Sequence, residues 1–287
     1  MVDIIHGATG AQGSPVLSAL TTAGRTAIAA VRHPEAVPDG IAARQVDLAS
    51  ADSLASAYEG ADGVFVHLPM GAPETAAAQA RAVVEAVTRA RPGRVVISTS
   101  GQIVDRPDSP LQATAGSPIM TLIDGVTGSG IPTAVVAPRL YLENLLLPVV
   151  LAPAHQEGVL RYPLPASFPV SWSSHLDVAD VVARLLMDTS VSGTVAVGHR
   201  PGLTGVDLAA AFSNHLGREV HFEAITPEAF GELITPLFGP AAAPVVELYR
   251  ALNAQDGCII AEDSSAQELL GLRPRPIEQW LKDLAVS

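Results

Sequence analysis

Apolar runs that alternate with helix-patterned segments organise the start of the chain. An apolar run at 2–5 leads into a glycine-containing turn at 7–13. A helical pattern with Val16 and Leu20 on its apolar face follows, and then a second apolar run at 26–31. This order predicts a strand, a turn, a helix and a second strand, which together form one βαβ unit.

The turn, with the sequence GATGAQG, has the chemistry of a phosphate-binding loop. Gly7 permits a tight turn, Gly10 lets backbone N–H groups approach a pyrophosphate, and Gly13 lets helix and strand pack closely. The pyrophosphate would lie at the positive end of the helix, for which Ser14 and Pro15 form a good N-cap and N1 pair. A glycine triplet alone also fits a tight turn without a ligand. The strand predicted before the turn and the helix predicted after it favour dinucleotide binding.

The end of the second strand indicates which dinucleotide binds. An NAD-specific site would carry Asp or Glu there to hold the ribose 2′-hydroxyl. The chain has Arg32 and His33 instead, and no acid before Glu35. The planar, permanently charged guanidinium of Arg32 suits a 2′-phosphate, although a solvated loop arginine would have the same surroundings. We therefore expect NADP(H) as the cofactor.

Further apolar runs continue the alternation. Strands are expected at 43–46, 63–69, 94–98 and 133–137, with helical patterns between them. The prediction is an α/β fold with a Rossmann-type, doubly wound parallel sheet and a smaller C-terminal substrate lobe.

The predicted domain organisation divides the chain near residue 150. Residues 1–150 would form the NAD(P)-binding domain, with the sheet completed by about 170–200, and residues 151–287 would form most of the lobe. The stretch 152–174 is dense in Pro and aromatic residues and is expected to be irregular. Helices are expected later in the chain, at about 177–186, 204–216, 227–238, 242–252 and 276–284.

The ends of the predicted strands supply the candidate site residues, because ligands of open parallel sheets bind beyond the carboxyl ends of the strands. Asp47 would face the adenine, although a turn or cap carboxylate is an equal alternative. His67 is a candidate acid/base, but a packed, hydrogen-bonded histidine is commoner within an apolar strand. The residues expected around the nicotinamide are His67, Leu68, Pro69, Met70, Ser98, Thr99 and Ser100.

Composition excludes several classes of function. The net charge of −12 argues against nucleic acid or an anionic membrane as a partner. The single cysteine, Cys258, excludes an intramolecular disulfide and a zinc cluster of several thiolates, and no metal site is expected. No apolar run reaches the ~18 residues of a membrane span, and a strand at the N-terminus leaves no room for a signal peptide. We expect a soluble, cytoplasmic protein. Its alanine-rich helices are compatible with a homodimer, although crossover helices carry the same pattern.

The chain resembles the NmrA-like, atypical short-chain dehydrogenase/reductase family, and within it the type-2 NAD(P)H:quinone oxidoreductase-like and azoreductase-like enzymes. The resemblance covers nearly the whole chain, and the SGIP…P…EN pattern is its most specific part. The family implies a Rossmann domain with a small C-terminal lobe, NADPH binding, and either reduction of quinone-like acceptors or cofactor sensing. The matching segments are GATGAQG, VRHPE, SGIPTAVVAPRLYLENLL, LGREVHFEAITPEAFGELI and LLGLRPRPIEQWLKDL.

The resemblance also implies roles for individual residues. It assigns the 2′-phosphate to Arg32, and the flanks of the nicotinamide to the segment after Ser98 and to the backbone from Pro138 to Tyr141. The residues that it assigns to the pyrophosphate are Gly7, Thr9, Gln12 and Gly13.

The Ser-Tyr-Lys device of ordinary short-chain dehydrogenases is absent. None of the four tyrosines has a lysine four residues later, and the single lysine, Lys282, lies near the C-terminus. Ser100 could match the family serine, but its partners are missing. Tyr141, beyond the sixth strand, could donate a hydrogen bond to the reacting oxygen, or it could simply pack over the cofactor.

Two functional classes remain. The first is an NADPH-dependent reductase of quinones or aromatic, polyketide-like ketones, which works mainly by proximity and orientation. The second is a non-catalytic NADP(H) sensor that docks on a regulator. A reductase needs an apolar pocket, which the stretch 162–172 with Phe230, Leu237 and Phe238 could line, although these residues could equally form the core of the lobe. We favour the reductase, because a well-formed substrate lobe is hard to explain in a sensor.

Overall fold

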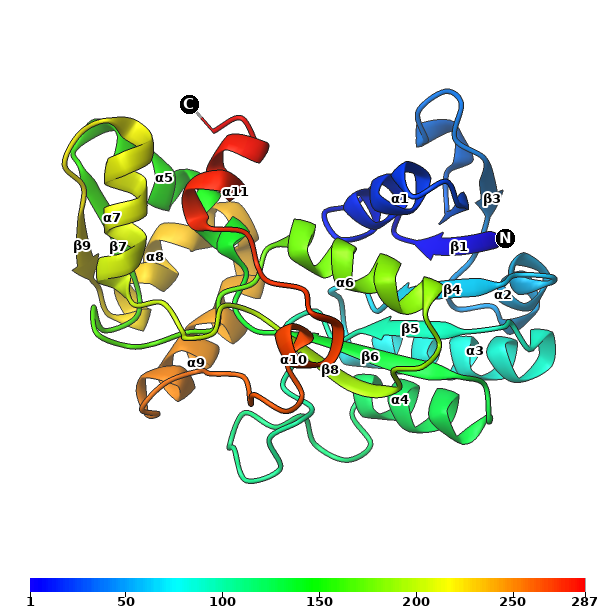
Figure 1. Ribbon diagram of the computed structural model, residues 1–287. Helices are drawn as coiled ribbons and strands as arrows, with labels where there is room; N and C mark the ends of the chain where they lie inside the picture. Colours follow the sequence, from blue (N-terminus) through cyan, green and yellow to red (C-terminus); the bar gives the residue numbers. More distant parts are fainter. Residues whose placement is uncertain (287) are drawn as a thin grey trace.

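A seven-stranded parallel sheet forms the centre of the computed structural model, which describes residues 1–286 (Figure 1). The strand order is β3-β2-β1-β4-β5-β6-β8, and every neighbouring pair is parallel. The predicted Rossmann-type, doubly wound fold is confirmed. The strands are β1 (Val2–His6), β2 (Thr26–Val31), β3 (Ala43–Gln45), β4 (Gly63–His67), β5 (Val95–Ser98), β6 (Thr133–Pro138) and β8 (Gly193–Val197).

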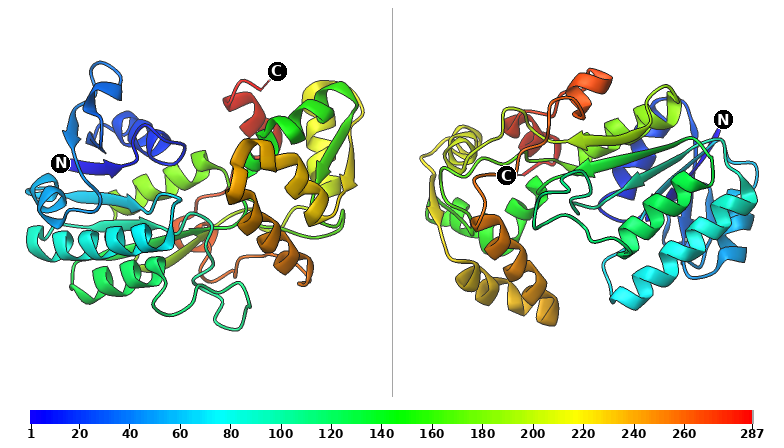
Figure 2. Two further views of the ribbon diagram at one scale, coloured as in Figure 1. Left: turned by 180° about the vertical axis from the view of Figure 1, so that it is seen from behind. Right: turned by 90° about the horizontal axis from the view of Figure 1, so that it is seen from below.

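Helices cover both faces of this sheet (Figures 1 and 2). One layer consists of α1 (Gly13–Thr22) and α6 (His175–Met187). The opposite layer consists of α2 (Ala51–Tyr58), α3 (Pro73–Ala90) and α4 (Pro118–Gly128). The carboxyl ends of the strands and the N-termini of α1 and α6 therefore meet at one edge of the sheet.

Successive side chains of the central strands alternate between the two apolar layers. Ile5 and Phe65 are fully buried in the layer of α1 and α6, whereas Ile4 and Val64 are fully buried in the opposite layer. This burial on both faces explains why the strands appear in the sequence as continuous apolar runs.

The smaller lobe lies beside the carboxyl edge of the sheet (Figure 1). Its core includes Tyr162, Trp172, Phe230 and Trp280, all at most 2% exposed. A two-stranded parallel sheet pairs β7 with β9 in this lobe. The lobe elements are η2 (Leu142–Leu146), α5 (Pro148–Gln156), β7 (Val159–Tyr162), α7 (Gly205–Leu216), β9 (His221–Ala224), α8 (Pro227–Phe238), η3 (Gly239–Ala241) and α9 (Ala242–Asn253).

The C-terminal segment returns from the sheet to the lobe. After α10 (Ala266–Leu270), which lies beside β8, the chain forms α11 (Ile277–Asp283) against α7. His215 of α7 binds the carbonyl oxygen of Val286 at 2.6 Å. Val286, the last residue that the structure describes, is therefore bound to α7 of the lobe.

Two local predictions are wrong. The N-cap of α1 is Gln12, not Ser14, because the amide of Ser14 already donates to the carbonyl of Gly10 at 3.0 Å and Gly13 is already helical. The stretch 152–174 is also more regular than expected, since it contains the end of α5 and all of β7. The partner of β7 lies about sixty residues later, at His221–Ala224, so no local pattern could reveal the pairing.

One stretch, Pro227–Asn253, is long and apolar enough to cross a membrane by length and composition, which differs from the expectation above. In the structure this stretch is divided by the 3-10 turn η3 into α8 and α9, of 12 residues each. The two helices pack on one another with Val246 against Gly231. Each is shorter than the ~20 residues that a helical span requires.

Candidate functional site

The glycine turn forms a tight backbone cradle at the N-terminus of α1. Gly7 has φ +60°, and its carbonyl accepts the amide of Gly10 at 2.8 Å. A Cβ on Gly13 would lie 2.3 Å from the oxygen of Gly7, so only glycine allows this approach of helix to strand. The cradle fits a pyrophosphate, because the free N–H groups at the start of a helix attract anions.

His67 packs directly on this turn. A Cβ on Gly7 would lie 2.3 Å from Nε2 of His67, and the ring centroid of His67 lies 5.9 Å from that of Phe65. The packing expected of this histidine is present, but Nε2 lacks the expected hydrogen bond, since it has no partner among residues 1–286. Burial lowers the pKa of His67, so the ring is uncharged at neutral pH.

A cavity of about 480 Å³ lies where the adenosine end of a dinucleotide is expected. The guanidinium of Arg32 forms no ion pair within the described part of the chain. Asp47 accepts the amide of Ala49 at 2.9 Å through one carboxylate oxygen, so it acts as a turn carboxylate and also faces the cavity. The cavity is lined by Arg32, His33, Gln45, Val46, Asp47 and Ser53.

A hydrogen-bonded cluster joins the glycine turn to the ends of β5 and β6. Nε2 of Gln12 donates to Oγ of Ser100 at 3.0 Å. Oε1 of Gln12 accepts from Oγ of Ser98 at 2.9 Å and from the phenol of Tyr141 at 3.3 Å. The amide of Ser100, whose φ is +54°, donates to Oγ of Ser98 at 3.2 Å. Both predicted catalytic residues, Tyr141 and Ser100, therefore meet at one point beside the phosphate cradle.

Tyr141 is held as a neutral phenol. Burial raises its pKa above the usual value of 10. Its ring lies against His175, the first residue of α6, with the ring centroids 4.2 Å apart. Burial and the nearby His67 lower the pKa of His175 to about 4, so this ring is uncharged at neutral pH as well. The cluster contains hydrogen-bond donors but no acid with a pKa near 7.

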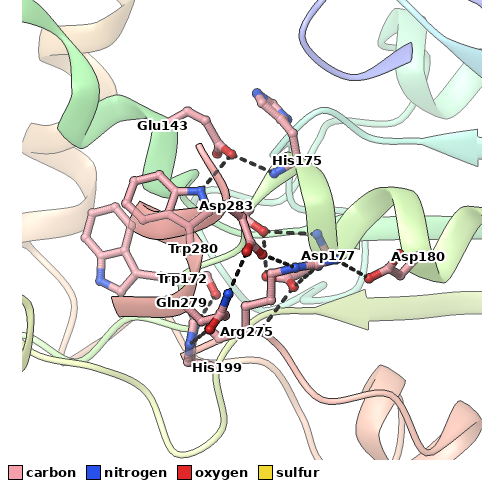
Figure 3. A network of polar contacts seen from close by, with 11 residues as sticks. Glu143, Trp172, His175, Asp177, Asp180, His199, Arg275, Gln279, Trp280 and Asp283 are labelled. Atoms are coloured by element: carbon pink, nitrogen blue, oxygen red, sulfur yellow. Dashed lines mark hydrogen bonds and ion pairs between the residues drawn. The ribbon is translucent and has the colours of Figure 1, made fainter. Parts of the chain in front are cut away.

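Glu143 and the C-terminal segment support this part of the site (Figure 3). Oε1 of Glu143 accepts the backbone amide of His175 at 3.0 Å and Nε1–H of Trp280 at 3.2 Å. Burial raises the pKa of Glu143. Arg275 binds Asp177 at 2.8 Å, which ties the segment before α11 to the first turn of α6. The start of α6, and with it His175, is thus held from the lobe side.

The remaining predicted cofactor residues lie along the same edge. Leu68 and Pro69 follow β4 and are half-buried. Thr99 follows β5 and is fully buried, and its hydroxyl has no partner within residues 1–286. Pro138 ends β6 and is buried. Their roles toward a cofactor stay predictions.

The structure also identifies residues that the sequence analysis missed. His175 and Glu143 adjoin Tyr141 but were not singled out. The available signal was Ser174, whose hydroxyl accepts the amide of Asp177 at 3.0 Å and caps α6, which places His175 at the carboxyl edge of the sheet.

The aromatic residues expected to line a substrate pocket mostly form the core of the lobe instead. Tyr162 and Phe230 are fully packed, and the phenols of Tyr162 and Tyr249 share a hydrogen bond. Leu237 and Phe238 are exposed. No group of three or more His, Cys, Asp and Glu side chains within residues 1–286 is placed to hold a metal ion.

Comparison with known proteins places this fold and cradle in a family. The NmrA-like family model matches residues 3–281. The chain belongs to the NmrA-like family. It is 29% identical over 282 residues to a (4-alkanoyl-5-oxo-2,5-dihydrofuran-3-yl)methyl phosphate reductase of Streptomyces griseus, covering 96% of this chain and 95% of that protein. It is 30% identical over 253 residues to an NAD(P)H azoreductase of Xenophilus azovorans, covering 86% of this chain and 85% of that protein.

Solved structures show the same fold at lower identity. The triphenylmethane reductase of Citrobacter sp., complexed with NADP(H), has a TM-score of 0.79 at 20% identity and covers 98% of this chain and 99% of its own. An NADPH-dependent quinone oxidoreductase of Escherichia coli, complexed with NADPH, has a TM-score of 0.73 at 19% identity, with coverage of 99% and 100%. The predicted family is confirmed, and the predicted oxidoreductase class and NADP(H) cofactor agree with the names of these relatives.

Proposed function

We propose that this NmrA-like protein is an NADPH-dependent reductase that transfers hydride to a quinone or a similarly conjugated carbonyl acceptor without a Ser-Tyr-Lys triad. The observation that carries this proposal is the arrangement along one sheet edge. The Arg32 cavity, the glycine cradle and the Tyr141 cluster follow one another in the order in which a dinucleotide would present its 2′-phosphate, pyrophosphate and nicotinamide.

The cofactor preference rests on Arg32. Its guanidinium is unpaired within the described residues and borders the 480 Å³ cavity, where no carboxylate is placed to bind a free 2′-hydroxyl except Asp47. One oxygen of Asp47 is already engaged by the amide of Ala49. A planar cation beside an open cavity favours NADPH over NADH.

The protein residues orient the acceptor and stabilise negative charge. When bound, NADPH supplies a hydride from C4 of its nicotinamide. The neutral phenol of Tyr141 donates a hydrogen bond to the oxygen on which charge develops, and the hydroxyl of Ser100 can add a second. Neither Tyr141 nor His175 is an effective proton donor at pH 7. Burial raises the pKa of the Tyr141 phenol, so it gives up its proton poorly, and His175 is a neutral imidazole without an imidazolium proton to transfer. The proton that completes the reduction comes from water.

This chemistry selects acceptors whose reduced anions are stable. An acceptor that spreads the incoming electron pair over a conjugated system needs no strong acid in the transition state, whereas a simple ketone does. The azo, triphenylmethane-dye, quinone and alkanoyl-furanone groups in the names of the relatives and of the solved structures are all conjugated. Their shared electronic property supports the proposed substrate class.

The test is NADPH oxidation measured against a panel of quinones, alkanoyl-butenolides and polycyclic aromatic ketones, with simple ketones and NADH as comparators. Turnover of conjugated acceptors with a preference for NADPH supports the proposal. Tight NADPH binding without turnover on any acceptor would refute it and favour the non-catalytic NADP(H) sensor. A cytoplasmic location and a homodimer stay predictions, the second testable by sedimentation.

A further inference from the structure

Gln12 occupies the N-cap position of α1 but does not cap the helix. N-cap side chains usually accept a hydrogen bond from the first turn, and that of Gln12 makes none. Its amide instead extends across the site to the ends of β5 and β6, where it forms hydrogen bonds with Ser98, Ser100 and Tyr141. The side chain therefore connects the phosphate cradle to the hydroxyl cluster at the ends of β5 and β6.

We propose that Gln12 is a positioning residue, which aligns the phenol of Tyr141 with the cofactor bound on the glycine turn, rather than a side-chain ligand of the pyrophosphate. This inference rests on the proposed reductase function. It changes the role that family resemblance suggests for Gln12, since only its backbone would face the phosphates.

The chemistry of the contacts requires an amide at this position. Oε1 accepts two hydroxyl donors while Nε2 donates to a third oxygen, and among the standard side chains only Gln and Asn carry a carbonyl oxygen beside an N–H donor. A Glu could not donate to Ser100 and would add a negative charge beside the phosphates. An Asn is one methylene shorter and would not span the same distance.

Tyr141 is then held at two points. The ring of His175 packs against its ring in a tilted arrangement, with the centroids 4.2 Å apart, and Gln12 accepts a hydrogen bond from its hydroxyl at 3.3 Å. Because the phenol has one proton, its O–H turns from Gln12 to the acceptor oxygen when an acceptor binds, while Ser98 keeps Gln12 in place at 2.9 Å. Gln12 thus sets the position of the phenol before the acceptor arrives. Removing the amide would leave the cradle intact but release the phenol.

The experiment compares Gln12→Leu with the wild type and with Gln156→Leu, a matched exposed change at the end of α5 in the lobe. Fluorescence titration gives the Kd for NADPH, and steady-state turnover of the best acceptor gives kcat. We expect kcat to fall about tenfold or more in Gln12→Leu, with a Kd within about threefold of the wild type, because misplacing a reacting group affects the chemical step. Gln156→Leu should match the wild type in both. A large increase in Kd with an unchanged kcat would overturn the inference.

A double-mutant cycle makes the test specific to Tyr141. If Gln12 acts through the phenol, Gln12→Leu should have little further effect on kcat in a Tyr141→Phe background. A full additive loss would contradict the proposal.

A readout independent of turnover separates this inference from the proposed function. With tyrosines labelled at Cζ, the NMR signal that is missing from Tyr141→Phe should shift when NADPH binds to the wild type. The shift should be much smaller in Gln12→Leu and unchanged in Gln156→Leu. An equal shift in Gln12→Leu would refute the role of Gln12 even if no acceptor is ever reduced.

Discussion

Replacing Gly13 by alanine gives the sharpest test of the cradle. The added Cβ would lie 2.3 Å from the oxygen of Gly7, 2.4 Å from its carbonyl carbon and 2.5 Å from the oxygen of His6. All three are backbone atoms, so no side-chain rotation relieves the contact. The start of α1 would have to move about 1 Å away from β1 to restore ordinary van der Waals distances.

The expected cost follows from this displacement. Overpacking costs about 1–3 kcal/mol when side chains can adjust, and rigid backbone places this case at or above the upper end. Alanine regains up to about 1 kcal/mol through its better helix propensity. We therefore expect the free energy of unfolding to fall by about 2 kcal/mol or more, a large share of the usual 5–15 kcal/mol. The NADPH Kd should rise at least about tenfold, since the N–H groups move with the helix.

Two other glycines serve as controls in the same urea-unfolding and NADPH-titration assays. A Cβ on Gly10 would meet only the oxygen of Gly7, at 3.3 Å, so Gly10→Ala should keep most of the stability while losing NADPH affinity. A Cβ on Gly128 would meet nothing within 4 Å at the end of α4, so Gly128→Ala should be neutral or slightly stabilising. A Gly13→Ala variant that keeps the unfolding free energy and the NADPH Kd of the wild type would refute this reasoning.

Four further expectations follow from single side chains. Arg32→Ala should raise the KM for NADPH by about 10- to 100-fold and leave that for NADH nearly unchanged, as a lost charged hydrogen bond implies; equal effects on both would exclude contact with the 2′-phosphate. Tyr141→Phe should lower kcat about tenfold without changing the NADPH Kd, because it removes one hydrogen bond to the reacting oxygen. The kcat of the wild type should show no loss from phenol ionisation up to pH 10, because burial raises the pKa of this phenol. Asp3→Asn should lower the free energy of chemical unfolding by about 3–5 kcal/mol, because the buried guanidinium of Arg25 donates two hydrogen bonds of 2.7 Å to that carboxylate. A decrease below about 1 kcal/mol would refute the importance of this ion pair. Burial lowers the pKa of His6 from 6.5 to about 3, so between these pH values the unfolded chain binds a proton that the folded chain does not. Stability should therefore fall as the pH drops from about 6.5 toward 3, and the melting temperature of His6→Gln should depend less on pH over that window.

The sheet could be predicted from the sequence because each strand carries its own signal. Strands buried on both faces, such as β1 and β4, appear as short apolar runs. The cradle could be predicted as well, since Gly7, Gly10 and Gly13 lie within one short segment, 7–13.

The lobe and the support of Tyr141 depend instead on contacts between distant segments. β7 pairs with a strand about sixty residues away, and Glu143 receives the indole N–H of Trp280, which is 137 positions later. His175 adjoins Tyr141 only because α6 begins at the same sheet edge. The sequence around each of these residues carries no signal for a partner so far along the chain. Hydrophobic periodicity therefore cannot predict these contacts.

The path of the chain limits how this protein can be recombined. The lobe consists of three separated segments, η2 to β7, α7 to α9, and α11, and between them α6 with β8 and then α10 return to the sheet (Figure 2). A chimera that exchanges acceptor specificity with a relative therefore cannot be made with one crossover point. It must transfer all three segments together, or the donor's lobe will meet a foreign C-terminal helix where Asn214 of α7 binds Glu278 of α11.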